Sequence, residues 1–198
     1  MMTLETTSSS LLENETRIEV NSEYVVLVNE QDEVIGSEEK LKAHQEALLH
    51  RAFSVFVYRK TEDSFEFLLQ QRSDNKYHCG GLWTNTCCSH PRLGEEVLEA
   101  AQRRLKEEMS LAVSLNKVGS FLYKAPFANG LTEHEFDHVL VGEYDGIQAI
   151  VLDPEEAQAF RWIALDQLQA ELVLHPKRYT PWFSLAFELV MENLCCKF

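Results

Sequence analysis

Side chains that commonly bind divalent metal ions are spread across the middle of the sequence. They are three histidines and two glutamates, His44, His50, His90, Glu133 and Glu135. The glutamates are two positions apart, so on an extended strand both carboxylates point to one face. Such a mixed set favours a transition metal, or an ion such as Mn²⁺ or Mg²⁺, over a thiolate site. The alternative is that these are scattered surface or capping residues, because the chain has 7 histidines.

A second candidate site lies on a predicted helix. Arg104 and Glu108 are one helical turn apart, where two side chains can form an ion pair or share a ligand. Mg²⁺ usually takes few protein carboxylates and completes its shell with phosphate oxygens and water. The acidic residues of this helix are therefore candidate Mg²⁺ ligands, and the alternative is a solvated, charged helix face.

Basic residues lie near a pair of glycines. Arg72 and Lys76 precede Gly80 and Gly81, and Lys40 lies further upstream. In a chain with a formal net charge of -14, such a local cluster is a reasonable site for an anion. The alternative is that these residues keep a surface loop soluble.

The acidic composition restricts the partners. A basic surface for nucleic acid is not indicated, and no apolar run is long enough to span a bilayer. The first residues lack a basic start followed by a long apolar stretch, so export is not indicated either. The 5 cysteines are an odd number in a chain of 198 residues, which favours reduced thiols. We expect a cytoplasmic protein with a small-molecule substrate, no nucleic-acid or membrane partner, and a monomeric or weakly homodimeric state.

The elements that must position these residues follow from the apolar pattern. We expect a flexible tail over residues 1–21 and one α/β domain over residues 22–198. The predicted strands are 24–28, 52–58, 65–69, 119–124, 136–144 and 160–163. The predicted helices are 95–109, a short one that begins at Asp153 with Pro154 in its first turn, and 182–194. Their irregular alternation predicts a mixed sheet covered by helices.

Four separated strings resemble the type 1 isopentenyl-diphosphate isomerases. They are EKLKAH at 39–44, LLHRAFS at 48–54, LWTNTCCSHP at 82–91 and EHE at 133–135. The strings share their order and spacing with that family, and the similarity extends from about residue 23 to residue 182. The resemblance implies a Nudix-type fold, in which helices sandwich a mixed β-sheet. It also implies an enzyme of isoprenoid biosynthesis that interconverts isopentenyl and dimethylallyl diphosphate through a tertiary carbocation.

The resemblance implies roles for individual residues as well. One divalent ion (Mn²⁺, Mg²⁺ or Zn²⁺) would be bound by His44, His50, His90, Glu133 and Glu135. A Mg²⁺ ion that accompanies the diphosphate would be bound by Glu108. The diphosphate would be neutralised by Lys40, Arg72, Lys76 and Arg104. The proton transfers would be carried out by Cys88 and Glu135, with Tyr123 nearby and Trp182 over the carbon chain.

The helical part of the Nudix signature is altered. Glu95 and Arg103 are in place, whereas Arg104 stands where a hydrolase has glutamate, and Ser89 and Ser110 stand at the two glycine positions. The missing carboxylate argues against the alternative activity, hydrolysis of a nucleoside diphosphate derivative. A domain that keeps the fold without catalysis is a second alternative, against which the complete ligand set and Cys88 count.

The adjacent cysteines leave a choice of which thiol faces the site. On an extended segment Cys87 and Cys88 point to opposite faces, and Cys88 shares a face with His90 two positions on. We therefore expect Cys88 to face the site and Cys87 to face the core.

Overall fold

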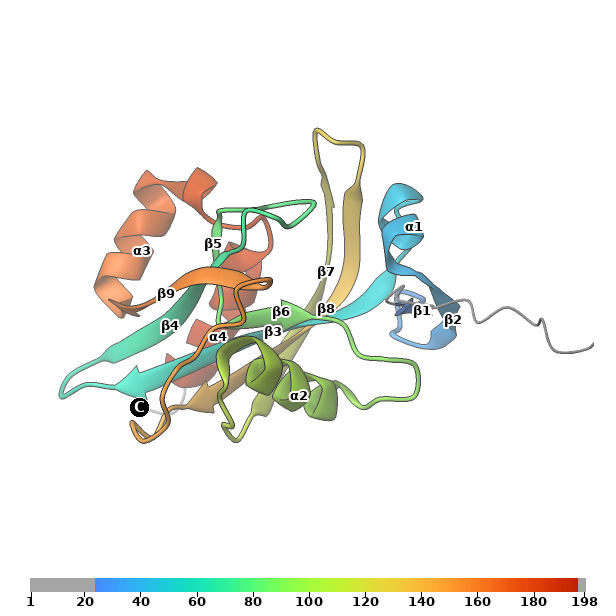
Figure 1. The fold of residues 1–198 in the computed structure, drawn as a ribbon. Helices are drawn as coiled ribbons and strands as arrows, with labels where there is room; N and C mark the ends of the chain where they lie inside the picture. The colour runs from blue at the N-terminus through green and yellow to red at the C-terminus, as the bar shows by residue number, and fades with distance from the viewer. Residues whose placement is uncertain (1–23, 196–198) are drawn as a thin grey trace, which may run out of the picture.

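The computed structural model describes residues 24–195, so the predicted tail at 1–21 lies outside the described residues. Within that range, nine strands form one mixed sheet with helices on both faces (Figure 1). The strands are β1 (Tyr24–Val28), β2 (Val34–Glu39), β3 (His50–Lys60), β4 (Phe65–Arg72), β5 (Trp83–Thr84), β6 (Cys87–Ser89), β7 (Asn116–Pro126), β8 (Thr132–Glu143) and β9 (Ala157–Ala164). The helices are α1 (Lys40–Gln45), α2 (Val97–Met109), α3 (Leu165–Leu174), the 3₁₀ turn η1 (Pro176–Arg178) and α4 (Phe183–Cys195).

The long strand β3 organises the sheet. It runs antiparallel to β1, β4 and β6 and parallel to β8. β7 pairs with the other edge of β8, and β9 pairs with β4. The parallel pairing places His50 directly opposite Glu135, and the β7–β8 pairing places Tyr123 opposite the same glutamate.

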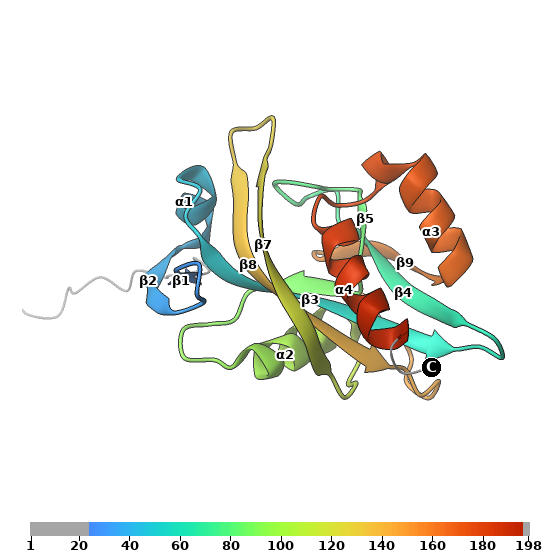
Figure 2. The same ribbon diagram turned by 180° about the vertical axis from the view of Figure 1, so that it is seen from behind.

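The core lies on both faces of the sheet because side chains alternate along β3. Val55 and Val57 pack with Leu105 of α2 in one buried cluster. Phe56 points to the other face and stacks edge-on against Phe183 of α4, with ring centroids 5.5 Å apart. Figures 1 and 2 show α2 and α4 on opposite sides of the sheet. The prediction of a mixed sheet sandwiched between helices is therefore confirmed.

One predicted helix is absent. Residues 154–156 form a turn, in which the Asp153 side chain accepts a hydrogen bond from the backbone N–H of Glu155 (3.0 Å). The chain cannot continue as a helix because β9 begins at Ala157, which pairs with Arg72 of β4. Asp153 thus caps a turn between strands.

Six elements were not predicted, namely β2, β5, β6, α1, α3 and η1. α1 has six residues, too few to show a helical period, and it begins because Glu39 accepts hydrogen bonds from the backbone N–H groups of Leu41 and Lys42. β3 also begins earlier than predicted, at His50. None of the helices in residues 24–195 has the length and apolar character needed to cross a membrane.

Candidate metal centre and active site

The predicted metal ligands come from four regions of the fold and meet at one place. α1 carries His44, β3 starts with His50, His90 follows β6, and β8 carries Glu133 and Glu135. One nitrogen or oxygen atom of each lies within 4.8 Å of the others. The two glutamates reach the same point because they are two positions apart on a strand.

The donor chemistry of this cluster fits a divalent ion. The Nδ1 atoms of His44 and His50 contact the backbone carbonyls of Lys40 (2.6 Å) and Leu48 (2.9 Å), which turns both Nε2 atoms toward the carboxylates. His50 Nε2 is buried and has no hydrogen-bond partner among the described residues. Imidazoles held in this way through their second nitrogen, beside paired carboxylates, are typical of metal sites.

Burial and ion pairing set the charge of the cluster. Burial lowers the pKa of His90 to about 4, although its Nε2 lies 3.0 Å from Glu135 Oε1. Burial alone would raise the pKa of Glu133, but hydrogen bonds from His44 and His78 hold it well below its usual range. His90 and Glu133 are thus in the protonation states that metal ions bind, a neutral imidazole and an ionised carboxylate.

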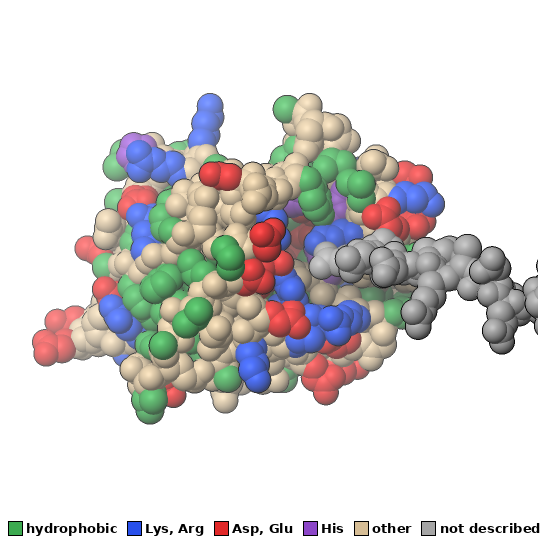
Figure 3. Space-filling view, in the orientation of Figure 1, with side chains coloured by type: hydrophobic (Ala, Val, Ile, Leu, Met, Phe, Trp, Pro, Cys, Tyr) green, Lys and Arg blue, Asp and Glu red, His purple; other side chains and the backbone are tan. Residues whose placement is uncertain are grey.

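A cavity opens beside the cluster. It is lined by predicted site residues, which are Lys40, Arg72, Lys76, Cys88, His90, Arg104, Tyr123, Glu133, Glu135 and Trp182. It is also lined by unpredicted residues, among them Ser54, Tyr77, His78, Asp137 and Glu156. Figure 3 shows histidine and basic side chains gathered below the tip of the β7–β8 hairpin. His44, His50 and Glu108 do not line the cavity.

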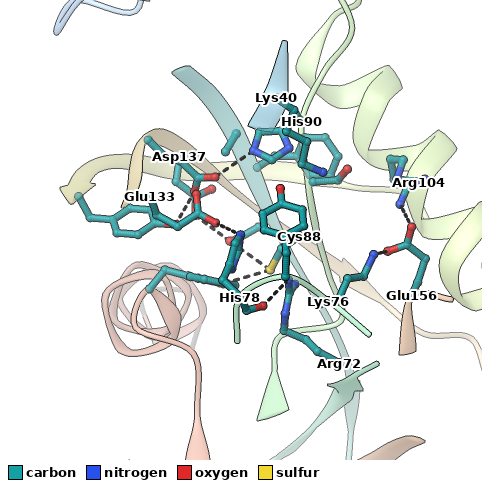
Figure 4. A pocket seen from close by; sticks show the side chains of 18 residues that line it. Lys40, Arg72, Lys76, His78, Cys88, His90, Arg104, Glu133, Asp137 and Glu156 are labelled. Carbon is teal, nitrogen blue, oxygen red and sulfur yellow. Dashed lines mark hydrogen bonds and ion pairs between the residues drawn. The ribbon is translucent and has the colours of Figure 1, made fainter. Parts of the chain in front are cut away.

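The basic residues of the cavity are bridged by a carboxylate. Glu156 pairs with Lys76 and with Arg104, whose Nη2 atom lies 2.8 Å from Glu156 Oε1 (Figure 4). Burial acts to raise the pKa of Glu156, but these two cations lower it to about 2. Arg104 Nη2 also lies 2.9 Å from Oε1 of the buried Glu108, so the predicted Mg²⁺ ligand contacts a predicted diphosphate-binding residue. Lys76 and Arg104 are therefore already close together, in an arrangement in which both could bind one anion.

The two cysteines of β6 lie in different surroundings. Cys87 is fully buried in the core cluster beneath α2, whereas Cys88 lines the cavity. The Cys88 thiol donates to Asn85 Oδ1 (2.8 Å), and Trp182 Nε1 lies 3.1 Å from its sulfur. Burial raises the pKa of Cys88 to about 12. The alternation along β6 thus turns Cys88 into the cavity, as expected.

Another hydrogen bond joins two predicted site residues across the β7–β8 pair. The Tyr123 hydroxyl donates to Glu135 Oε2. Burial raises the pKa of Tyr123 well above its ordinary value, so its hydroxyl stays protonated as a donor. Glu135 is therefore held by hydrogen bonds with Tyr123 and His90, and Nε2 of the facing His50 lies 3.5 Å from its Oε1.

The unpredicted cavity residues differ in whether the sequence indicates them. Asp137 continues the alternation of Glu133 and Glu135 along β8, which is a signal for the same face of the strand. Its carboxylate accepts a hydrogen bond from Ser54 (2.7 Å). His78 and Glu156 lie in connections between strands, where no period indicates the direction of a side chain.

Comparison with known proteins identifies the class of this fold. The family model of the NUDIX domain matches residues 48–183. The structure of DR0079 from Deinococcus radiodurans aligns with a TM-score of 0.60 at 21% identity, over 77% of this chain and 90% of that one. The NUDIX domain of Shewanella oneidensis NrtR aligns with a TM-score of 0.56 at 17% identity, over 74% and 87% of the two chains. The fold is that of a NUDIX domain.

Sequence relatives define the family within that class. An isopentenyl-diphosphate Delta-isomerase of Photobacterium profundum is 46% identical, over 87% of this chain and 96% of the relative. The isopentenyl-diphosphate Delta-isomerase of Serratia proteamaculans is 48% identical, over 81% of this chain and 87% of the relative. The chain belongs to the isopentenyl-diphosphate Delta-isomerase family.

Proposed function

We propose that this enzyme interconverts isopentenyl diphosphate and dimethylallyl diphosphate for isoprenoid biosynthesis. Its membership of the isomerase family supports this activity. The observation that carries the proposal is that a thiol and a carboxylate, those of Cys88 and Glu135, line one cavity that also holds basic side chains. Figure 4 shows Cys88 between the acidic cluster around Glu133 and the basic residues Lys76 and Arg104.

The reaction needs two proton transfers and no other reagent. One proton adds to the terminal carbon of the double bond, which leaves a tertiary carbocation at the branched carbon. A different proton then leaves the neighbouring carbon, and its bonding electrons form the new double bond, so the molecular formula is unchanged. We assign these transfers to Cys88 and Glu135, because each can reach the substrate from the cavity wall.

The cavity must also protect a carbocation from water. Cys88 and Glu135 are largely buried, so the reacting carbons would be enclosed by protein. Trp182 lies against Cys88, and its indole face can stabilise a passing cation through the ring quadrupole. Tyr123 holds Glu135 in one orientation through its hydrogen bond.

The basic residues would bind the diphosphate end of the substrate. Lys40, Arg72, Lys76 and Arg104 line the cavity, and their charges offset those of the phosphates. The substrate would compete with Glu156 for Lys76 and Arg104. Glu108, beside Arg104, would hold a Mg²⁺ ion together with phosphate oxygens.

The histidine and glutamate cluster would hold one further divalent ion, Mn²⁺, Mg²⁺ or Zn²⁺. Its ligands would be His44, His50, His90, Glu133 and Glu135. When bound, the ion supplies positive charge that withdraws electron density from the carboxylates it contacts. We further propose that the enzyme acts in the cytoplasm, as a monomer or weak homodimer, without nucleic-acid or membrane partners; the charge of -14 supports the absence of nucleic acid.

Product analysis tests the activity directly. Purified, metal-loaded protein is incubated with isopentenyl diphosphate and Mg²⁺, and dimethylallyl diphosphate is measured by chromatography. We expect allylic product well above the no-enzyme control, with no release of phosphate. The Glu135→Gln variant should lose almost all of this product, because the amide cannot accept and return a proton. Absence of product from the unmodified enzyme, or phosphate release from nucleoside diphosphate derivatives instead, would refute the proposal.

A further inference from the structure

His78 lies beside the metal cluster but is not one of its five predicted ligands. It belongs to the connection between β4 and β5, and it is 9% exposed. Its Nε2 atom lies 2.7 Å from Glu133 Oε1, and the other oxygen of that carboxylate, Oε2, lies 3.1 Å from His44 Nε2. The two oxygens of Glu133 therefore have different imidazole partners.

The other ring nitrogen of His78, Nδ1, helps to assign the donor in the contact between His78 and Glu133. Nδ1 is buried and has no hydrogen-bond partner among the described residues. A separation of 2.7 Å from an ionised carboxylate requires a proton on Nε2. We assign the tautomer on that basis, with Nε2–H donating to Glu133 Oε1. The unpartnered Nδ1 is then an acceptor.

The ring of His78 is fixed by its neighbours. It stacks on Phe127 of the β7–β8 connection, with centroids 5.0 Å apart and an interplanar angle of 2°. It also stacks on His44, with centroids 5.5 Å apart. The backbone beside it is tied to the same hairpin, because Asn129 Nδ2 donates to the carbonyl of Tyr77 (2.6 Å). His78 is thus packed between α1 and the hairpin that carries Glu133.

We propose that His78 is a positioning residue of the metal centre. It holds Oε1 of Glu133 and so presents Oε2 to an ion bound by the five-residue cluster. If Nε2 of His44 were a metal ligand, it could no longer donate to Glu133, and His78 would remain to fix the carboxylate. Ligands fixed in this way bind more tightly, because less freedom is lost when the ion arrives.

His78 should also affect substrate binding, an expectation that rests on the proposed function. The same connection carries Lys76, two residues away, and Lys76 is assigned to the diphosphate. Metal binding and diphosphate binding would then order one segment, and each would favour the other by the same factor. Loss of His78 should therefore raise the KM for the substrate more than it lowers kcat.

Metal affinity without substrate is the direct test. Mn²⁺ affinity is measured by competition with a chelator for the unmodified protein, His78→Ala, His78→Gln and His175→Ala. We expect His78→Ala to weaken Mn²⁺ binding about 10- to 100-fold, and His78→Gln, which keeps an N–H donor, to recover part of the loss. His175 is exposed at the end of α3, so His175→Ala should leave the affinity unchanged. Unchanged affinity in His78→Ala would overturn the proposal.

Two further measurements separate positioning from other roles. X-ray absorption of the Zn²⁺-loaded proteins counts the bound imidazoles, and His78→Ala should keep the same number as the unmodified protein. A count lower by one would make His78 a ligand and would overturn the positioning role. The metal-free variants should unfold within a few degrees of the unmodified protein, which separates lost affinity from lost structure.

A second variant covers the case in which His78→Ala does not fold. Phe127→Ala removes the ring on which His78 stacks and should weaken Mn²⁺ binding in the same direction by a smaller factor. In that case, full Mn²⁺ affinity in Phe127→Ala would refute the proposal. Because these measurements use no substrate, their outcome does not depend on the result of the isomerase assay.

Discussion

Cys87 and Cys88 are neighbours on β6, yet they should respond to mutation in opposite ways. Cys88→Ala should abolish turnover with ion content and folding unchanged, because the cavity loses its thiol and the core loses nothing. Cys87→Ala should keep turnover and lower the free energy of unfolding by about 1 kcal/mol, since it leaves a small void beneath α2. Steady-state kinetics and thermal unfolding of both variants measure these effects.

Chemical labelling gives an independent check on the same pair. A thiol-directed alkylating agent should inactivate the enzyme, substrate should protect it, and peptide mapping should place the label on Cys88. Wild-type rates from Cys88→Ala, or a loss of activity confined to Cys87→Ala, would contradict the assignment.

The residues of the site differ in how far the sequence could predict them. Glu133 and Glu135 lie on a strand, where alternation alone indicates a shared face. The same rule distinguished Cys88 from Cys87. His78 and Glu156 lie in connections whose path depends on contacts with distant strands, so nothing local indicates that they reach the cavity.

At the scale of elements, α3 is joined to β9 by an ion pair whose strength depends on pH. Arg161 Nη2 lies 2.8 Å from Glu171 Oε2, and the Tyr179 hydroxyl donates to the same carboxylate. The hydrogen bond from Arg161 lowers the pKa of Glu171 below its ordinary value. The pair therefore stabilises the fold above the ordinary carboxyl pKa, about 4.3, and this stability is lost as the pH falls through the lowered pKa.

Substitution of Glu171 should reveal how the free energy of unfolding depends on pH through this ion pair. Glu171→Gln should lower the free energy of unfolding by roughly 1 kcal/mol at neutral pH, and the difference from the unmodified protein should shrink in acid. Denaturant unfolding at several pH values measures it. Glu143→Gln breaks the more exposed pair with Lys60 and should cost less at every pH. An equal loss in both variants, or a difference that grows in acid, would argue against a structural role for the Glu171 pair.

Elements with a strong period were predictable, and those defined by tertiary contacts were not. The strands β3 and β4 and the helices α2 and α4 are long enough for their apolar residues to show a strand or helix period. α3 carries Val173 and Leu174 on its exposed side, which obscures its period. The residues after Asp153 have the composition of a helix start, but pairing of β9 with β4 determines their conformation.

For the whole molecule, the metal cluster should act as a cross-link between distant segments. Without an ion, Glu133 and Glu135 are buried side by side, and each charge opposes the other. A bound ion removes that repulsion and stabilises only the folded state, by about 2.7 kcal/mol when its concentration is 100 times the dissociation constant. We expect Mn²⁺ to raise the unfolding temperature of chelator-treated protein by several degrees.

His90→Ala provides the matched comparison. It removes one ligand at the cavity edge, so most of the stabilisation by Mn²⁺ and nearly all activity should disappear. Calorimetry with and without Mn²⁺, together with elemental analysis, measures both effects. Stoichiometric metal in the purified His90→Ala protein would show that the ion binds elsewhere.

The parallel pairing of β3 with β8 has a consequence for the order of events during folding. His44 and Glu133 are in contact but lie 89 positions apart in the chain. The ribosome releases all three histidine ligands before either glutamate, and closing so long a loop is slow compared with forming hairpins and helices. The metal centre is therefore completed late, after β8 has docked beside β3. An ion bound there slows the loss of the native state and does little to help the nascent chain find it.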